Sequence, residues 1–346
     1  MDHDRTATIL ALGGPMRRRD KGEEEAIPTV ALTCPRCRER LDWTDGGPRC
    51  GACGHEVRSV QGVLDFVDDS ARSSHDELDH HTHDHKSAQV AHYDRSEGEE
   101  FEITRPHGAP RLYRFFLDEK LRRTLSPIRS PLAGASALAV CGGSGMDAEY
   151  LARAGLSVIS SDLSIGAATR TIARSSRYEV PIQSIVADVE HLPFDDQSVD
   201  LVAVHDGLHH LTDPYAGLTE MARVARRWIT VTEPARASIT WLAIRVGLAQ
   251  EREAAGNPVA RLDPASVARL LEEAGFVVLR AERYAMYYPQ QPGRMFAVLS
   301  HPLAYPVVRA WWSAANALVG RFGNKLVVVA ERAHGGAPSA ATSRGG

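Results

Sequence analysis

The run LAVCGGSGMDAEYLARAGLSVISSD (residues 138–162) predicts the architecture of the chain more directly than any other segment. Apolar residues 137–140 are followed at once by three glycines within residues 142–145, which predicts a buried strand ending in a turn that lets backbone approach a ligand. Apolar residues then recur at helical spacing as far as Gly155, and a second strand ends at Asp162. A strand, a glycine turn and a helix form the first half of a βαβ unit, whose helix N-terminus faces the ligand.

Asp162 indicates what that ligand contains. It lies 17 residues beyond Gly145, close to the spacing at which an acidic group accepts hydrogen bonds from ribose hydroxyls in dinucleotide-binding folds. A glycine turn with a downstream acid also occurs in NAD-dependent enzymes. These two features therefore predict a nucleoside ligand without identifying it.

Two further strands make the pattern specific. Residues 185–187 predict a strand that ends at Asp188, and residues 199–204 predict another that continues into HDGLHHLTDP (205–214). The four strand ends together resemble the class I S-adenosylmethionine (SAM)-dependent methyltransferases, in the small-molecule branch that includes ubiquinone-pathway enzymes. The resemblance covers roughly residues 93–332. It implies an α/β Rossmann-like core with a seven-stranded, mostly parallel sheet and helices on both faces.

The resemblance also implies a cofactor site. In the family the glycine turn cradles the methionine part of SAM, the acid after the second strand holds the ribose, and the acid after the third meets the adenine amino group. An aromatic residue ahead of the first strand often touches the cofactor. The cofactor-binding residues implied here are Cys141, Gly142, Gly143, Ser144, Gly145, Asp162, Leu163, Asp188, Val189, His205 and Tyr93.

This sequence departs from the family at two positions. Ala139 replaces the usual acid before the turn, and Cys141 stands where the first glycine is expected, so a contact to the methionine end is absent or supplied elsewhere. Plain structural roles are the alternatives: Asp162 and Asp188 as strand-end caps, the glycines as a tight connection, and Tyr93 as a core or surface residue. We interpret Cys141 as a small buried hydrophobe and not as a nucleophile.

The chemistry expected of such a site is methyl transfer by in-line displacement, because the leaving group is a neutral thioether. A hydroxyl or amine acceptor also needs a base, and histidine titrates nearest neutral pH. The candidates are His205, His209, His210 and Glu233. Neighbouring residues on a helix point about 100° apart, so at most one of the adjacent pair His209 and His210 is expected to face the pocket.

Four cysteines provide a second motif. Cys34, Cys37, Cys50 and Cys53 have the spacing C-x2-C-x12-C-x2-C, which brings two pairs of thiolates onto one ion and leaves no open coordination position. A structural zinc site is therefore predicted, against the alternatives of two disulfides or four free thiols. The surrounding segment resembles Trm112-like zinc ribbons, which accompany methyltransferases as partner chains or fused domains, and this resemblance implies a docking role.

The composition completes the prediction. A net charge of −4 argues against a general polyanion binder, and the chain has neither an apolar run long enough to span a bilayer nor the pattern of a signal peptide, so a cytoplasmic protein is expected. The expected organisation is a disordered segment at 1–27, a zinc ribbon at 28–67, a His/Asp-rich linker at 68–90, a methyltransferase domain at 91–332 and a disordered tail at 333–346.

Two segments exceed a minimal core, at about 239–261 and 294–320. The second walls an apolar substrate pocket or closes over it as a lid, packs as ordinary core, or attaches to a membrane surface. The leading function is methylation of a small, hydrophobic or aromatic metabolite at O, N or C. The alternatives are methylation of rRNA or tRNA bases, suggested by the arginines of the ribbon, and a non-catalytic scaffold with the SAM fold.

Overall fold

The structure is a computed structural model that describes residues 30, 32–44, 47–67, 86–87, 89–91, 93–94, 99–235, 262–287, 289 and 291–333. The segments predicted to be disordered and the segment predicted at 239–261 lie outside the described residues, apart from Ala333. The predicted linker lies outside them up to residue 85.

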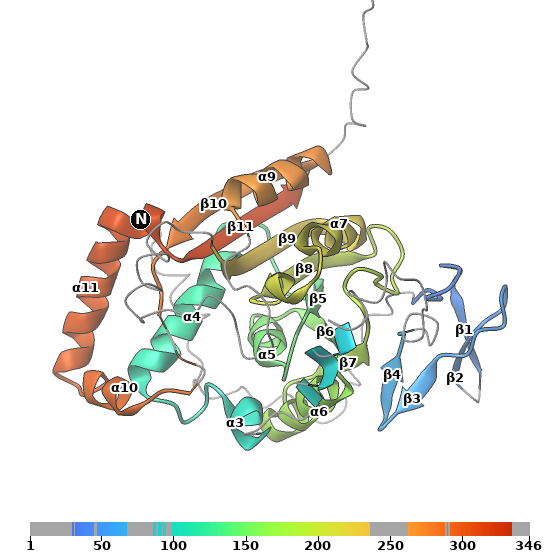
Figure 1. The fold of residues 1–346 in the computed structure, drawn as a ribbon, viewed down its shortest axis with the longest axis horizontal. Coiled ribbons are helices and arrows are strands. Elements are labelled where there is room, and N and C mark those ends of the chain that lie inside the picture. The colour runs from blue at the N-terminus through green and yellow to red at the C-terminus, as the bar shows by residue number, and fades with distance from the viewer. Residues whose placement is uncertain are drawn as a thin grey trace, which may run out of the picture.

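The centre of the molecule is a nine-stranded sheet in the order β10-β11-β9-β8-β5-β6-β7-β4-β3 (Figure 1). Pairing is parallel from β4 through β7, β6, β5 and β8 to β9, and antiparallel at both ends. The strands are β3 (Arg58–Val60), β4 (Val63–Asp65), β5 (Ser136–Val140), β6 (Ser157–Asp162), β7 (Ile182–Val186), β8 (Val199–His205), β9 (Ala225–Pro234), β10 (Phe276–Tyr284) and β11 (Lys325–Arg332). Strands β5 to β11 confirm the predicted seven-stranded, mostly parallel core.

The strand order reverses direction at the centre of the sheet. From β5 the chain moves outward to β6 and β7, then returns to place β8 on the other side of β5. A reversal of this kind opens a crevice at the carboxyl ends of the two central strands, where open α/β sheets bind their ligands. The predicted glycine turn follows β5, and of the predicted histidines His205 ends β8 while His209 and His210 follow it.

Helices cover both faces of the sheet (Figure 1). Leu117 and Leu151 lie in one apolar cluster and Leu218 and Leu271 in the other, and successive residues of β5 alternate between the two clusters. Because both faces are buried, the central strands read as continuous apolar runs. The helices are α3 (Glu99–Thr104), α4 (Arg111–Leu125), α5 (Met146–Arg153), α6 (Ile165–Tyr178), η1 (Leu208–His210), α7 (Pro214–Val224), α9 (Pro264–Glu273), α10 (Arg294–Leu299), α11 (Ala304–Val319) and η2 (Gly320–Phe322).

The cysteine-containing segment extends this sheet. Its own hairpin consists of β1 (Leu41–Thr44) and β2 (Gly47–Cys50), while its second hairpin, β3 and β4, pairs with the edge strand β7. Phe66 continues the contact, its N–H donating to the Val186 carbonyl at 2.8 Å. The sequence predicts an accessory ribbon but not its merger with the main sheet, because pairing between distant strands has no local signature.

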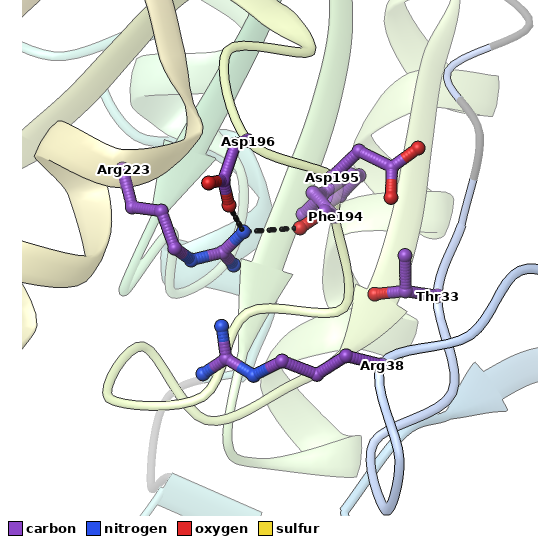
Figure 2. Close-up of a pocket in the computed structure, with 6 residues that line it drawn as sticks. All are labelled: Thr33, Arg38, Phe194, Asp195, Asp196 and Arg223. Atoms are coloured by element: carbon purple, nitrogen blue, oxygen red, sulfur yellow. Dashed lines mark hydrogen bonds and ion pairs between the residues drawn. The ribbon is translucent and has the colours of Figure 1, made fainter.

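Polar contacts fasten the same segment to the loop before β8. The Thr33 N–H donates to the Pro193 carbonyl at 3.0 Å, and Arg40 Nε donates to Asp195 Oδ2 at 3.1 Å. A pocket of about 420 Å³ lies at this junction, where Arg223 Nη1 donates at 2.7 Å to both the Phe194 carbonyl and the Asp196 carboxylate (Figure 2). The cysteine-containing segment is therefore held against the main sheet of its own chain.

Candidate functional site

The turn after β5 lies at the carboxyl ends of the central strands. A Cβ on Gly142 would lie 2.2 Å from Ser160 Oγ, and one on Gly145 would lie 2.8 Å from Thr171 Cγ2. Packing against β6 and α6 therefore accounts for two of the three glycines. Gly143 differs, because its φ is +52° and nothing lies within 4 Å of where a Cβ would stand. The space beside Gly143 is what a ligand can use.

Cys141 begins this turn with a φ of 51°. Loss of hydration on burial raises the pKa of the Cys141 thiol well above its usual range, and the negative charge of nearby carboxylates raises it further. The thiol therefore stays neutral, in line with the prediction of a small hydrophobe and not a nucleophile.

Asp162 lies beside the turn. Its Oδ2 accepts from the Gly143 N–H at 2.9 Å and its Oδ1 from the Ser164 N–H at 3.0 Å. Burial raises the pKa of Asp162, and these two N–H donors oppose only part of the shift. A carboxylate oxygen can accept two hydrogen bonds, so both oxygens keep capacity for a ligand hydroxyl.

Asp188 follows β7 and contacts a residue from the predicted linker. Lys86 Nζ lies 2.6 Å from Asp188 Oδ2 and also contacts the Glu190 carboxylate. Burial alone would lower the pKa of Lys86, but the two carboxylates outweigh it and raise that pKa. Gln89 is buried as well. The solvated linker predicted for residues 68–90 is thus wrong at its C-terminal end, because Lys86 pairs with two carboxylates of the domain and Gln89 is buried.

Tyr93 and Asp94 continue the same segment across neighbouring strand ends. The Asp94 carboxylate accepts from Ser164 Oγ at 2.6 Å and from the Gly166 N–H at 3.0 Å, and Arg170 Nη2 donates to the Tyr93 carbonyl at 2.7 Å. The Tyr93 hydroxyl lies 3.2 Å from His210 Nε2. Lys86, Tyr93 and Asp94 therefore contact residues at the carboxyl ends of β7, β8 and β6.

The end of β8 faces the first turn of α5. His205 Nδ1 lies 3.4 Å from Asp147 Oδ1, and its side chain is 1% exposed. Neither ring nitrogen of His205, nor Oδ1 of Asp147, has a hydrogen-bond partner among the described residues. Burial would raise the pKa of Asp147, but His205 and Lys120 outweigh it and lower that pKa. Buried polar atoms without partners are costly, so this pair is suited to a polar ligand.

Asp206, the next residue, joins two lysines. Its carboxylate accepts from Lys120 Nζ on α4 at 2.8 Å and from Lys325 Nζ on β11 at 2.6 Å. Burial would raise the pKa of Asp206, but the two ammonium groups hold it well below its usual range. Sequence reasoning missed Asp147 and both lysines. The available signal for Lys120 was a charge four residues after Phe116, on the apolar side of its helix.

The candidate bases separate into a buried group and a partly exposed one. His209 Nδ1 lies 2.7 Å from Glu233 Oε2, with side chains 1% and 0% exposed, and Glu233 Oε1 also accepts from the N–H groups of Gly207 and Leu208. His210 is half-buried, with its ring 4.2 Å from that of His209. The geometry gives His209 and Glu233 a structural contact and leaves His210 beside Tyr93.

A buried arginine supports the turn from behind. Arg174 of α6 donates from Nε to the Ser144 carbonyl at 2.8 Å and from Nη1 to Glu149 Oε2 at 2.8 Å. Arg153 and His107 contact the other oxygen of Glu149, each at 2.8 Å. Although burial acts to raise it, hydrogen bonds from these partners lower the pKa of Glu149 to about 2.

The four cysteines of the ribbon form one cluster. Their sulfurs all lie within 4.8 Å of one another, with Cys34 and Cys53 Sγ 3.6 Å apart and Cys37 and Cys50 Sγ 3.4 Å apart. Zinc–sulfur bonds of about 2.3 Å in a tetrahedron separate the sulfurs by roughly 3.8 Å. The cluster therefore fits a tetrahedral ion, as the spacing predicts.

Known proteins resemble the chain over the same region. Residues 138–227 match a family model described as a methyltransferase domain. A demethylmenaquinone methyltransferase of Mycobacterium sp. (strain JLS) is 30% identical over 166 residues, which cover 42% of this chain and 70% of that protein. The chain belongs to the class I SAM-dependent methyltransferases. The residues that match the family model begin in β5 and end in β9, so they include the ends of β5, β6, β7 and β8.

Other relatives of this methyltransferase match shorter stretches. A demethylmenaquinone methyltransferase of Corynebacterium urealyticum is 37% identical over 112 residues, covering 32% of this chain and 46% of that protein. The chain thus spans less than half of that relative. The structure of magnesium protoporphyrin IX methyltransferase from Synechocystis PCC 6803 with bound SAH aligns with a TM-score of 0.49 at 15% identity, over 72% of this chain and 100% of that one.

Proposed function

We propose that this methyltransferase transfers the methyl group of SAM to a small, hydrophobic or aromatic acceptor. The observation that carries the proposal is the meeting of the open Gly143 turn, Asp162 and the His205–Asp147 pair at the reversal of strand order. Asp188 follows β7, the strand that lies next to β6 on the side away from β5 and the glycine turn. Each group matches one part of a nucleoside that carries a charged amino-acid tail.

The residues present fit SAM at both ends. Asp162 would accept from the ribose hydroxyls and Asp188 from the adenine amino group, with Lys86 as a competing partner of Asp188. His205 and Asp147 are buried and have ring nitrogens and a carboxylate oxygen to offer the ammonium and carboxylate of the methionine end. Asp147 thereby supplies the acid that the family usually has where Ala139 stands here.

The acceptor is proposed to be an aromatic metabolite of the quinone type. Several relatives are named as demethylmenaquinone methyltransferases, which supports that class. SAM, when bound, supplies an electrophilic methyl group, and the protein has to align the acceptor behind it and exclude water. Lys120 and Lys325, held by Asp206, place positive charge beside the site, which favours an acceptor hydroxyl in its ionised form.

His210 is the base that this arrangement favours. It is half-buried and in contact with the Tyr93 hydroxyl, whereas His209 and Glu233 are occupied with each other. His205 is assigned to the cofactor side. Removal of the acceptor proton by His210 near neutral pH needs no unusual environment.

The cysteine cluster is proposed to hold a structural zinc ion. Four thiolates leave no open position for catalysis, and the ribbon is too small to fold without a metal or a partner surface. Its resemblance to Trm112-like ribbons supports a docking role, here filled in cis by β7 and the loop before β8. Metal analysis of protein purified without added zinc tests this point: about one equivalent is expected, and a content near zero would refute it.

Methylation of RNA remains the second candidate and a non-catalytic scaffold the third. The ribbon arginines that suggested RNA include Arg38, which lies 3.6 Å from Glu220, and Arg40, which contacts Asp195. These two arginines are therefore engaged with carboxylates of the same chain.

A labelling experiment and a calorimetric measurement of SAM binding together separate the three functions. Protein is incubated with SAM carrying a labelled methyl group together with quinone-containing lipid extract, polar metabolites, total RNA or protein, and the labelled fraction is identified. We expect label in the lipid extract. Label in RNA would transfer the activity to the second candidate, and failure to bind SAM in calorimetry would leave the scaffold.

A further inference from the structure

Helices α10 and α11 expose an apolar surface at the end of the molecule opposite the ribbon (Figure 1). Leu303, Val307, Trp311 and Leu318 recur at helical spacing and are 79%, 66%, 70% and 78% exposed. The neighbouring exposed apolar side chains are Met295, Val298, Val319 and Phe322. We call these eight residues the outer face. Single exposed apolar residues are common, but several large ones at helical spacing on one side of a helix indicate an interaction surface.

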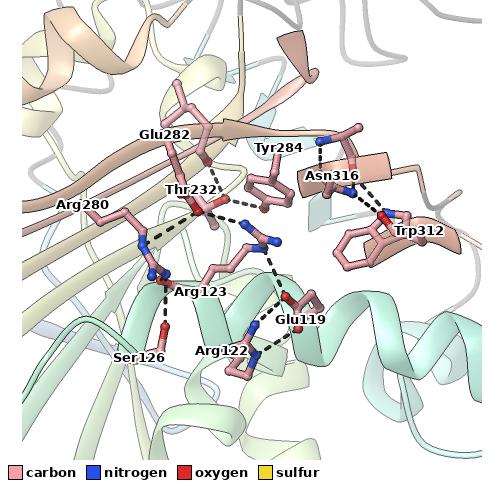
Figure 3. Close-up of polar contacts among 12 residues, drawn as sticks. Glu119, Arg122, Arg123, Ser126, Thr232, Arg280, Glu282, Tyr284, Trp312 and Asn316 are labelled. Carbon is pink, nitrogen blue, oxygen red and sulfur yellow. Dashed lines mark hydrogen bonds and ion pairs between the residues drawn. The ribbon is translucent and has the colours of Figure 1, made fainter. Parts of the chain in front are cut away.

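The opposite side of α11 packs against the rest of the domain. Trp312 is 7% exposed, and its Nε1 donates to the Ala285 carbonyl at 3.0 Å, while Asn316 Oδ1 accepts from the Ala285 N–H at 2.8 Å (Figure 3). The Trp312 ring also packs edge to face on Phe115 of α4, with centroids 5.4 Å apart. Adjacent tryptophans thus have opposite environments. The outer face is not needed for the contact of α11 with the domain.

The charge of this region identifies what the outer face suits. From Arg283 to Ala330 the sequence contains no aspartate or glutamate, although the whole chain carries a net charge of −4. Arg294, Arg309 and Arg321 are exposed there. Exposed arginines next to tryptophan, leucine and phenylalanine, without acids, are the composition of helices that lie in the headgroup region of anionic bilayers.

A second copy of the chain and insertion across a bilayer both fit the outer face less well. A second copy related by a two-fold axis would bring the same arginines of both copies to one interface, where like charges repel. Among the described residues no helix is both long and apolar enough to cross a bilayer. We propose that the outer face attaches this protein to the surface of a bilayer that contains anionic lipid.

Attachment would place the acceptor side of the domain near the membrane. Helix α11 packs on α4, and α4 supplies Lys120 to Asp206 beside the proposed methyl-transfer site. Attachment follows from the exposure, packing and charge of α10 and α11 and is independent of the proposed function.

Co-sedimentation of the full chain with vesicles tests the proposal. Vesicles of phosphatidylcholine alone are compared with vesicles containing 30% phosphatidylglycerol, in the absence of SAM and acceptor. We expect binding to the anionic vesicles that falls in high salt. Trp311→Gln and Leu318→Gln should each lower the partition coefficient on the order of tenfold, and Arg309→Gln about fivefold.

Trp43→Gln is the matched control, because Trp43 is 68% exposed but lies on the ribbon. It should bind vesicles like the unmodified protein. All variants should keep the circular dichroism spectrum and the SAM affinity, because the positions are exposed and distant from the cofactor side. If the unmodified protein does not bind SAM, the result counts against the proposed function and leaves the vesicle result unaffected.

Three outcomes would overturn the proposal. The first is an absence of binding to the anionic vesicles. The second is equal binding by Trp311→Gln, Leu318→Gln and the unmodified protein. The third is a dimer, detected by light scattering, that Trp311→Gln dissociates, because the outer face would then contact a second copy.

Discussion

Asp162 contacts two segments of backbone through one carboxylate. Its oxygens accept from the N–H groups of Gly143 and Ser164, so the side chain fixes the relation between the turn after β5 and the start of α6. The spacing in the sequence was sufficient to find it. The residues that the spacing could not reveal, Asp147 and Lys120, come to the site from helices whose positions only packing determines.

Replacing Asp162 by Asn should weaken binding of S-adenosylhomocysteine. The substitution replaces one acceptor oxygen with an NH₂ group. That NH₂ group would face a backbone N–H and could not accept a hydrogen bond from a ribose hydroxyl. Charge-assisted hydrogen bonds contribute about 1.5–3 kcal/mol, so Kd in calorimetry should rise about 10- to 100-fold. Asp196→Asn, at a side chain that is 74% exposed, is the control. An unchanged Kd in Asp162→Asn would contradict the cofactor assignment.

His209 and His210 should respond differently to the same substitution. His209→Gln removes a buried partner of Glu233, so the free energy of unfolding should fall by about 1–3 kcal/mol in urea titrations. His210→Gln should leave that free energy within about 0.5 kcal/mol while lowering kcat, with recovery at higher pH if the acceptor loses its proton to hydroxide. Equal effects on stability would remove the distinction between the two positions.

At the scale of elements, α5 and α6 meet through buried charges. Arg174 links the Ser144 carbonyl to Glu149, and Arg153 and His107 complete the shell around that carboxylate. Because an unpaired charge in this position is costly, the group acts as a unit that holds the glycine turn. Apolar periodicity before Gly155 predicted α5 itself, whereas its contact with α6 depends on packing.

This network predicts a dependence of stability on acid. The pKa of Glu149 is about 2 in the folded protein and about 4.5 in an unstructured chain. Its contribution is therefore complete above pH 4.5 and is lost as pH falls toward 2, up to about 3 kcal/mol. Urea unfolding at pH 7, 4.5 and 3 measures it. Glu149→Gln should be less stable at pH 7 and show a smaller decline, and an unaltered decline would exclude Glu149 as its source.

At the scale of the whole molecule, the cysteine cluster is joined to the main sheet. Cys34 and Cys50 lie in one apolar cluster with residues of the central strands, and β4 covers the edge of β7. A metal that orders the ribbon would therefore also protect a sheet edge that otherwise offers free backbone groups to other chains. The outer face of α10 and α11 lies at the opposite end (Figure 1).

Cys37→Ser should reduce bound zinc and destabilise more than the ribbon alone. With three thiolates the metal site weakens, β3 and β4 lose their support, and the exposed edge of β7 favours aggregation. We expect a lower Tm and light scattering on heating, measured together with the metal content. Cys141→Ser should keep its zinc. A Cys37→Ser protein with unchanged zinc and Tm would refute the structural role.

The sequence by itself determined the order of strands and helices, the turn at Gly143, the acids at Asp162 and Asp188, and the set of four cysteines, because periodicity, glycine and short ligand spacings act over neighbouring residues. Tertiary structure alone decided that β4 continues the sheet, that Lys86 reaches Asp188, that His209 is bound to Glu233 and that Trp311 faces outward while Trp312 packs inside. These facts depend on which distant surfaces meet. Such pairings are set by the combined burial and charge of the folded chain, and no local pattern encodes them.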